Sequence, residues 1–236
     1  AETLASLLLI DLIKPGHPVI FGPWPFVTDL RTGSFSGGSG EEAIMSAASA
    51  QITNHYGLAS SVGAGMTDSK SPDAQAGYEK GITVALAALA GCNNVSESSG
   101  MMASLMGYSF ESLVIDNDML GMVMRTVRGI EVNEETLSYR AIKDTVEGEG
   151  HFLRDPQTLE LMKTEYLYPT LADRSTQEEW EAEGSPDMRQ RAEKRAREIL
   201  NSHYPVYIDD ETDKKVRDTF PIEISRDVIK PTKDRF

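Results

Sequence analysis

The stretch LASSVGAGMTDSKSPDAQAGYEKGITVALAALAGCNNV, residues 58–95, carries the alternation that decides the fold. Its first eight residues are apolar or small and predict a buried strand, and a helix ending at Gly91 follows after a short polar loop. CNNV then predicts another short strand. Strand–loop–helix units of this kind present polar residues at the carboxyl edge of a parallel sheet, where α/β proteins bind ligands. Asp68, in the loop after the strand, is therefore a candidate site residue, with a turn or helix-capping role as the alternative.

The helix within this stretch has two sequence signals. Ser71 is placed to cap its first turn, with Pro72 just inside it. An apolar stripe follows at spacings of three and four, which predicts an amphipathic helix. Its members are Tyr78, Ile82, Leu86 and Leu89.

The same alternation extends toward the N-terminus. Residues 1–13 predict a helix, PVIFG at residues 18–22 predicts a buried strand, and residues 23–38 form a loop rich in Gly, Pro and Ser. Ser39 and Glu42 have the spacing of a capping box and open a helix that ends at Gly57. Alternation with connections of this length predicts an α/β fold with a parallel sheet and helices outside it.

The character of the chain changes after Gly129. Residues 96–110 predict a Gly/Ser/Met loop, and a helix carrying Leu113, Leu120, Val123 and Val127 follows, but no strand is evident beyond it. Helix starts are expected near Asn133, Asp155, Ser175 and Ser185. We therefore expect three parts: an α/β part over residues 1–130, a helical segment over residues 131–203 and an extended tail over residues 204–236.

Composition narrows the function classes. The chain has 236 residues and a net charge of −14, which argues against a nucleic-acid duplex or an anionic membrane as partner. No apolar run reaches the roughly 18 residues of a membrane span. The single cysteine, Cys92, excludes an internal disulfide and predicts a reducing, cytoplasmic location. The chain starts without Met inside a helical pattern, so we expect it to be part of a longer protein.

Several common chemistries lack their motifs. GGSG at residues 37–40 could cradle a phosphate, but no P-loop or GxGxxG motif accompanies it, which favours a helix cap. No GxSxG nucleophile motif is present, and no Cys/His cluster has the spacing of a zinc site, so no directly bound metal is expected. Cys92 is better explained as a buried thiol than as a nucleophile. His151, in EGEGHFLRDP, is equally compatible with a site and with a structural role.

Three separate segments resemble the trimethylamine methyltransferase family, the corrinoid-dependent methylamine and betaine methyltransferases. They are GMTDSKSPDAQAGYEKGITVALAALAG (65–91), SFESLVIDNDMLGMVMRTVRGIEVNEETL (109–137) and GHFLRDPQTL (150–159). The resemblance runs from the first residues to about residue 200 and implies the C-terminal half of a TIM-type (β/α)8 barrel, because family members are about twice as long. The archaeal trimethylamine enzymes use pyrrolysine, which this sequence lacks, so the resemblance is to the non-pyrrolysine branch, whose members act on quaternary amines such as glycine betaine.

The family resemblance implies transfer of a methyl group from a quaternary or tertiary amine to Co(I) of a corrinoid carried by a partner protein. A quaternary nitrogen leaves as a neutral amine, so no general acid is required. The sequence therefore does not identify the catalytic residues. A permanent cation needs aromatic faces and a carboxylate. The residues expected to bind the amine are Trp24, Phe26, Asp68, Glu97, Tyr108 and His151, and those expected to face the corrinoid are Gly22, Gly65, Gly100 and Met101.

The sequence is also compatible with two other functions. The chain could be a non-catalytic binding or scaffold module that keeps the fold of the family without turnover, and an enzyme of another (β/α)8 family with anionic chemistry is a more remote alternative. Half of a barrel would expose strand edges and apolar flanks, so we also expect a homo-oligomer.

Overall fold

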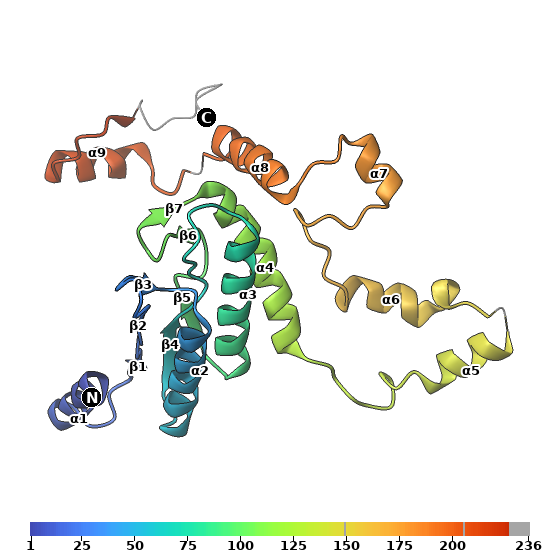
Figure 1. The fold of residues 1–236 in the computed structure, drawn as a ribbon, viewed down its shortest axis with the longest axis horizontal. Coiled ribbons are helices and arrows are strands. Elements are labelled where there is room, and N and C mark those ends of the chain that lie inside the picture. The colour runs from blue at the N-terminus through green and yellow to red at the C-terminus, as the bar shows by residue number, and fades with distance from the viewer. Residues whose placement is uncertain (149, 205, 227–236) are drawn as a thin grey trace. The chain divides into compact units, whose positions relative to one another are not determined.

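The computed structural model describes residues 1–148, 150–204 and 206–226, and the chain divides into two compact units (Figure 1). The first unit is Ala1–Ser175 and the second is Thr176–Phe236. This division differs from the boundaries expected after residues 130 and 203.

The first unit is built around a parallel sheet of three short strands. They are β1 (Ile20–Phe21), β4 (Ala59–Gly63) and β5 (Asn94–Ser96), in the order β1-β4-β5. Ile20 pairs with Ala59, and Val62 pairs with Val95, both in parallel register. The α/β class and the parallel sheet predicted from the alternation are thus confirmed, with strands shorter than the apolar runs suggested.

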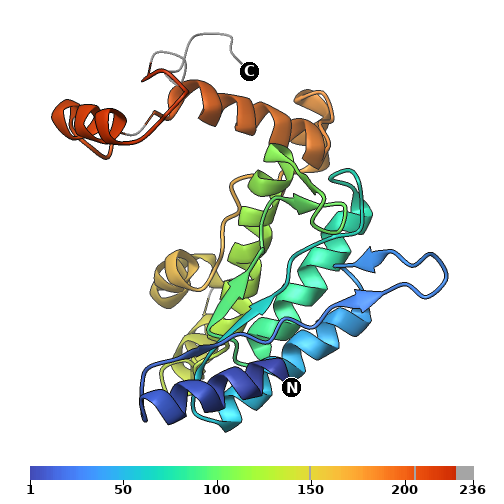
Figure 2. The same ribbon diagram turned by 90° about the vertical axis from the view of Figure 1, so that its left-hand side faces the viewer.

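Helices follow each of these strands and pack side by side (Figures 1 and 2). The helices of this part of the unit are α1 (Glu2–Ile13), α2 (Gly40–His55), α3 (Ala74–Leu89) and α4 (Phe110–Arg128). The apolar core lies between β4, α3 and α4, where Val62, Val84 and Val123 are buried together. The other face of β4 is polar, because the hydroxyls of Ser61 and Ser96 lie 3.1 Å apart across the strand pair.

The apolar stripe predicted on α3 is exposed, which overturns the expected orientation of this helix. Tyr78 is 64% exposed, and the other three stripe residues are exposed as well. The buried face of α3 instead carries small and polar residues, among them Glu79, Lys80 and Thr83. Its cap also differs from the prediction: Asp73, not Ser71, accepts the hydrogen bond from the Ala76 amide.

Two small antiparallel hairpins occupy segments that the sequence predicts as loops. Strands β2 (Val27–Thr28) and β3 (Phe35–Ser36) pair after β1, and strands β6 (Met101–Met102) and β7 (Gly107–Tyr108) pair after β5. Both hairpins follow the carboxyl end of a sheet strand. They therefore belong to the edge of the sheet at which the sequence predicts a site.

The remaining elements are helical, and no strand occurs after Tyr108 among the described residues, as predicted. The first unit ends with α5 (Tyr139–Glu147), the 3-10 helix η1 (Phe152–Arg154) and α6 (Pro156–Thr164). The second contains α7 (Gln177–Ala182), α8 (Met188–Ser202) and α9 (Asp210–Thr219). None of the described helices is long and apolar enough to span a membrane.

The helix starts agree with the sequence only in part. Asp155 caps α6 as predicted, whereas α7 and α8 are capped by Thr176 and Asp187, one and two residues beyond the predicted starts. Asn133 caps a turn instead, through its side chain and the Thr136 amide. Helix α9 lies in the segment expected to be extended, so that expectation is wrong there, and residues 205 and 227–236 of the predicted tail lie outside the described residues.

Candidate functional site

Asp68 lies in the loop after β4 and joins three loops at the carboxyl edge of the sheet. The hydroxyls of Ser36 and Ser104 each donate a hydrogen bond of 2.5 Å to its carboxylate, and the Gly37 amide donates one of 2.8 Å. Ser36 and Gly37 belong to the end of the β2–β3 hairpin, and Ser104 to the tip of the β6–β7 hairpin. Asp68 does not cap α3, since Asp73 does so. The donors to Asp68 thus come from the segments that follow β1 and β5 in the chain.

Glu79 supports this loop from the buried face of α3. Its Oε2 accepts hydrogen bonds from the Thr67 hydroxyl at 2.5 Å and from the Asp68 amide at 2.8 Å. Gly38 lies so close to Glu79 that a Cβ atom there would fall 2.5 Å from Oε2. Gly38 must therefore be small for the loop before α2 to close over this carboxylate. We call Ser36, Gly37, Asp68, Glu79 and Ser104 the Asp68 cluster.

The hydrogen bonds to Asp68 determine its charge. Burial by itself would raise the pKa of this carboxyl, but the donors on Ser104, Ser36 and Gly37, together with the charge of Lys70, outweigh burial and lower the pKa below its ordinary value. Asp68 is therefore an anion at neutral pH. It is half-buried, so its charge is available to a cation in a partly dry site.

Aromatic side chains lie next to the Asp68 cluster. Trp24 and Phe26 pack edge to face with their ring centroids 6.3 Å apart, and Phe26 packs in the same way on Phe35 at 5.0 Å. The Phe35 ring lies 3.5 Å from the Cβ position of Gly37, whose amide binds Asp68. Trp24 in turn lies 3.5 Å from the Cβ position of Gly63, at the end of β4. The aromatic rings and the ionised carboxylate thus lie at the same edge of the sheet.

A second carboxyl, Glu42, is buried in the first turn of α2. Its Oε1 lies 2.9 Å from the Ser46 hydroxyl, and its Oε2 has no hydrogen-bond partner among the described residues. Burial raises the pKa of Glu42 to about 7; the Ser46 hydrogen bond opposes this rise and the charge of Asp68 adds to it. Asp68 and Glu42 therefore have pKa values shifted in opposite directions within one region.

A buried ion pair anchors the loop after β5. The Lys80 ammonium lies 2.6 Å from Asp116 Oδ2, and this oxygen also accepts a hydrogen bond of 2.7 Å from the Gly100 amide. The Ser112 hydroxyl completes the group at 2.7 Å from Lys80 Nζ. Burial lowers the pKa of Lys80, and Asp116 partly offsets this. The pair links α3, α4 and the start of the β6–β7 hairpin.

The other residues expected to bind the amine lie in different settings. Glu97 is exposed and has a left-handed backbone with φ of 60°. Tyr108, on β7, is exposed and packs edge to face on Phe110. His151 lies immediately before η1, which packs on α6. Trp24 and Phe26 belong to the same β1–α2 segment as Gly37, whose amide donates to Asp68. The amine-binding roles assigned to all six residues stay predictions.

The glycines expected to face a corrinoid are packed against the chain itself. A Cβ on Gly65, which has φ of 86°, would lie 2.7 Å from Ser98 Cα and 2.9 Å from Val84 Cγ2. Gly100, with φ of 77°, is covered by the Tyr108 ring. A Cβ on Gly22 would lie 3.4 Å from the Ser61 carbonyl oxygen, and Met101 begins β6. Close contacts within the protein account for Gly65 and Gly100, and the corrinoid-facing role of all four residues stays a prediction.

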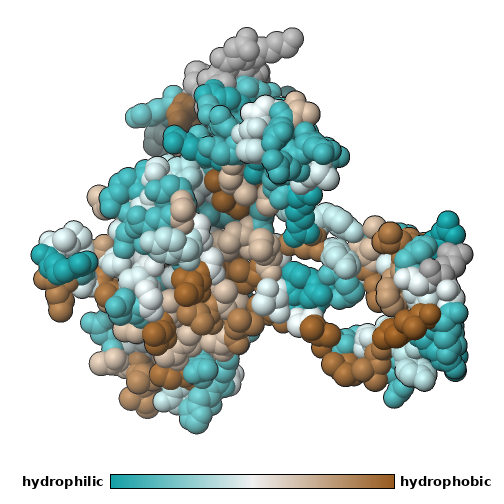
Figure 3. All heavy atoms as spheres, turned by 45° about the vertical axis from the view of Figure 1, so that its right-hand side comes forward, coloured by the Kyte–Doolittle hydropathy of each residue, from teal (hydrophilic) through white to brown (hydrophobic). Residues whose placement is uncertain are grey.

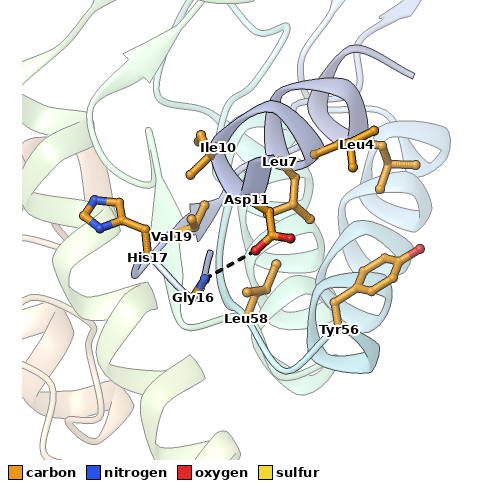
Figure 4. Close-up of a pocket in the computed structure, with 10 residues that line it drawn as sticks. Leu4, Leu7, Ile10, Asp11, Gly16, His17, Val19, Tyr56 and Leu58 are labelled. Atoms are coloured by element: carbon orange, nitrogen blue, oxygen red, sulfur yellow. Dashed lines mark hydrogen bonds between the residues drawn. The ribbon is translucent and has the colours of Figure 1, made fainter. Parts of the chain in front are cut away.

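A pocket of about 500 Å³ lies at the opposite edge of the sheet (Figure 4). It is lined mainly by apolar side chains of α1 and by Val19 and Leu58, which precede β1 and β4. Asp11 is one of its few polar residues and accepts a hydrogen bond of 3.3 Å from the Gly16 amide. The pocket is thus formed at the amino ends of the strands and does not include the Asp68 cluster.

Sequence reasoning missed most partners of Asp68. Ser36, Gly37 and Ser104 lie more than 30 positions away in the chain, and nothing local marks them as its donors. The spacing of Ser39 and Glu42 predicts a capping box. Ser39 does accept a hydrogen bond from the Glu42 amide, but the Glu42 side chain turns to Ser46. Among the described residues, no group of three or more His, Cys, Asp or Glu side chains could hold a metal ion.

Comparison with known proteins identifies the family. The trimethylamine methyltransferase family model matches residues 1–222. The chain is 38% identical to a glycine betaine methyltransferase of Desulfitobacterium hafniense (strain Y51) over 217 residues, which cover 92% of this chain and 45% of that protein. It is 40% identical to a trimethylamine methyltransferase MttB of Methanosarcina thermophila over 209 residues, which cover 89% of this chain and 43% of that protein. The chain thus spans less than half the length of these relatives. It belongs to the trimethylamine methyltransferase family.

Proposed function

We propose that this chain contributes the cation-binding edge of an amine methyltransferase. The reaction moves a methyl group from a quaternary or tertiary amine, of the glycine betaine type, to Co(I) of a corrinoid carried by a partner protein. Asp68 supplies the negative charge, and Trp24 and Phe26 supply aromatic faces for the methylated nitrogen. Glu97, Tyr108 and His151 are proposed as further contacts to the amine.

One observation carries the proposal: an ionised, half-buried carboxylate lies beside a row of packed aromatic rings at the carboxyl edge of a parallel sheet. A quaternary ammonium ion cannot donate N–H hydrogen bonds, so its recognition depends on ring faces and Coulomb attraction. Each ring face contributes about 0.5–2 kcal/mol to cation binding. The names of the relatives, which include glycine betaine and trimethylamine methyltransferases, support this substrate class.

A corrinoid is a wide planar group that needs an open apolar edge, and the residues here fit that need. The hairpin tips present exposed apolar side chains, Leu30 between β2 and β3 and Met106 between β6 and β7. When bound, the corrinoid supplies the low-valent cobalt that accepts the methyl group. We propose Gly22, Gly65, Gly100 and Met101 as the residues nearest to it.

We also propose that residues 1–130 are the C-terminal half of a TIM-type (β/α)8 barrel. The support is the order β1-β4-β5, with each strand parallel to its neighbour and followed by a helix. The polar face of β4, with Ser61 against Ser96, is compatible with the inside of a barrel. The chain also covers only 45% of a glycine betaine methyltransferase. On the evidence of its lone cysteine we place the protein in the cytoplasm.

The function is tested by incubating the protein with cob(I)alamin and a panel of methylated amines, while methylcobalamin formation is followed by absorbance. The panel contains glycine betaine, trimethylamine and tetramethylammonium, with neutral neopentyl alcohol as a control of similar shape. We expect methylcobalamin with a cationic amine and none with the control. Amine binding without transfer would favour the scaffold alternative, and neither binding nor transfer would contradict the proposal.

We propose that the protein forms a homo-oligomer through its exposed apolar faces. Helix α3 exposes Tyr78, Ile82 and Leu89, and α2 exposes Ile44 and Ile52. Apolar side chains also gather over the lower part of the sheet-containing body in Figure 3. Contiguous apolar surface on a soluble chain marks an interface. Sedimentation should show an oligomer at micromolar concentration, and Ile82→Lys should weaken it; a compact monomer would contradict this.

A further inference from the structure

The Ser46 hydroxyl has two hydrogen-bond acceptors and a single hydrogen. Its Oγ lies 2.9 Å from Glu42 Oε1 and 3.1 Å from the carbonyl oxygen of Gly63, and the Ser46 side chain is completely buried. Beside an ionised Glu42, the Ser46 hydrogen could serve only one of these two oxygens. A protonated Glu42 removes the conflict, because Glu42 donates to Ser46 and Ser46 donates to Gly63.

The second oxygen of Glu42 supports the same assignment. Glu42 is 1% exposed, and no described group donates a hydrogen bond to its Oε2. A buried carboxylate oxygen without a donor is costly, whereas a neutral carboxyl tolerates the same surroundings.

The charged groups of the elements packed around Glu42 favour its neutral form. Asp68 faces it from the loop after β4 and is an anion, and Glu79 on α3 accepts hydrogen bonds on both oxygens. The lysines of α3 and its loop are engaged elsewhere: Lys80 pairs with Asp116, and Lys70 donates to the Asp68 carbonyl. Among the described residues, no cation pairs with Glu42.

We propose that Glu42 is a proton-linked positioning residue of the amine site: in slightly acidic solution it is neutral while the site holds no cation, and it is deprotonated when a methylated ammonium ion binds beside Asp68. This inference rests on the proposed function and adds a regulatory feature to the same site. The step is balanced: the Glu42 O–H bond breaks, the proton leaves to solvent, and no bond of the amine changes. The charge of the bound cation then offsets the new carboxylate.

The geometry explains how the two events are coupled. Glu42 reaches the end of β4 through Ser46 and Gly63, and Trp24 also lies against Gly63. A cation held by Trp24 and Asp68 lowers the free energy of an ionised Glu42 by Coulomb attraction, which is strong in a partly dry site. A neutral ligand of the same shape provides no such attraction.

Calorimetry with tetramethylammonium as the probe tests the linkage. Titration at pH 6 in two buffers with different ionisation enthalpies measures the protons released per bound cation. With the Glu42 pKa at about 7, we expect close to one proton released at pH 6 and little release at pH 9. Glu42→Gln should release none and should bind the cation with little dependence on pH. Glu41→Gln removes the same charge from an exposed neighbour and should behave as wild type.

Infrared spectroscopy supplies a readout that does not depend on activity or on the variants. The ligand-free protein at pH 6 should show the carbonyl band of a buried neutral carboxylic acid, which disappears when the probe saturates the site. If Glu42→Gln does not fold, this band and the pH dependence of proton release in the wild type still test whether Glu42 loses its proton on cation binding.

The outcomes separate this inference from the proposed function. Cation binding without proton release, or proton release that persists in Glu42→Gln, would overturn the proposed role of Glu42. Neither result would contradict the proposal that the amine binds at Asp68. Absence of the carboxylic acid band in the ligand-free protein also overturns that role. If no methylated ammonium ion binds, both the role of Glu42 and the proposed amine site are overturned.

Discussion

The Gly37 amide donates a hydrogen bond of 2.8 Å to the Asp68 carboxylate, and this contact ties the loop before α2 to the loop after β4. The Ser104 amide, at the tip of the β6–β7 hairpin, reaches the same loop at the Thr67 carbonyl, 2.8 Å away. Three segments that follow three different strands are thereby held around one anion. A carboxylate with this many donors is fixed in position before any ligand arrives, which reduces the ordering cost of binding.

Asp68→Asn should weaken amine binding without unfolding the protein. The amide keeps the shape of the carboxylate but removes the charge, and loss of one such contact costs about 1–3 kcal/mol, or roughly tenfold to a hundredfold in affinity. Calorimetry with tetramethylammonium measures the affinity, and circular dichroism checks the fold. Asp29→Asn is the matched control, because Asp29 is a carboxylate of the β2–β3 hairpin that pairs with Arg31. Equal affinities for Asp68→Asn and wild type would contradict the role of Asp68.

Protein stability should fall as pH rises through the slightly acidic range, because of Glu42. The folded protein holds the Glu42 proton up to a pKa of about 7, whereas the unfolded chain releases it near 4.5. The stabilisation is therefore fully present below pH 4.5 and is lost as pH rises to about 7. It amounts to roughly 3 kcal/mol at most. Urea unfolding between pH 4 and 8 measures it.

The matched variants for this titration are Glu42→Gln and Glu41→Gln. Glu42→Gln should remove most of the fall in stability, since the amide cannot ionise. Glu41→Gln, on the exposed side of the same turn, should keep the fall. A wild-type protein whose stability is flat between pH 4.5 and 7 would show that Glu42 has an ordinary pKa.

Asp68 acts in the opposite sense: its lowered pKa contributes stability that is lost only as the pH drops below 3.8.

The sequence predicts the strand–helix order well because that order depends on residues that are close together in the chain. The strand at Ala59–Gly63 and the helix cap at Ser39 depend on residues close in the chain, so apolar runs and cap spacing reveal them. The hairpins β2–β3 and β6–β7 were missed because each strand has only two residues, which is too short for an alternating pattern.

The orientation of α3 could not be predicted from its own residues. The spacing of Tyr78 and Ile82 indicates one apolar side, but it does not say what covers that side. The opposite side is buried although it is polar, because its charged groups have partners. Lys80 pairs with Asp116 on α4, and Glu79 accepts a hydrogen bond from Thr67 in the loop after β4. Such partners compensate for burial and lie far apart in the chain. Of the proposed site, Trp24, Phe26 and Asp68 were accessible from sequence, whereas the donors around Asp68 were not.

Lys80→Met should strongly destabilise the protein, because it leaves the Asp116 carboxylate buried without its cation. Breaking a buried pair from one side costs about 3–5 kcal/mol. The double variant Lys80→Met/Asp116→Asn should recover part of this loss, since a neutral amide oxygen still accepts the Gly100 amide. Chemical denaturation gives the free energies of unfolding. Arg195→Met, which removes an exposed pair with Glu198, should change stability by less than about 1 kcal/mol. Additive single changes in the Lys80–Asp116 cycle would refute the pairing.

Gly65→Ala distinguishes two explanations for the glycine in the loop after β4. If the residue is small because of close contacts within the protein, the substitution should destabilise the fold. Gly65 has φ of 86°, and an added Cβ would lie 2.7 Å from Ser98 Cα and 2.9 Å from Val84 Cγ2. A left-handed backbone costs a non-glycine residue about 1–2 kcal/mol, and overpacking adds about 1–3 kcal/mol.

The matched control is Gly77→Ala, at a helical position of α3 with no atom within 4 Å of the added Cβ. This change should stabilise the protein by about 0.5–1 kcal/mol, because alanine favours a helix more than glycine does. Thermal and urea unfolding of both variants measure the difference. If Gly65 is instead small only to admit a corrinoid, Gly65→Ala will retain wild-type stability and lose methyl transfer to cob(I)alamin. The contacts with Ser98 and Val84 predict the reverse order of effects: the fold weakens first, and transfer is lost only in proportion to the unfolded fraction.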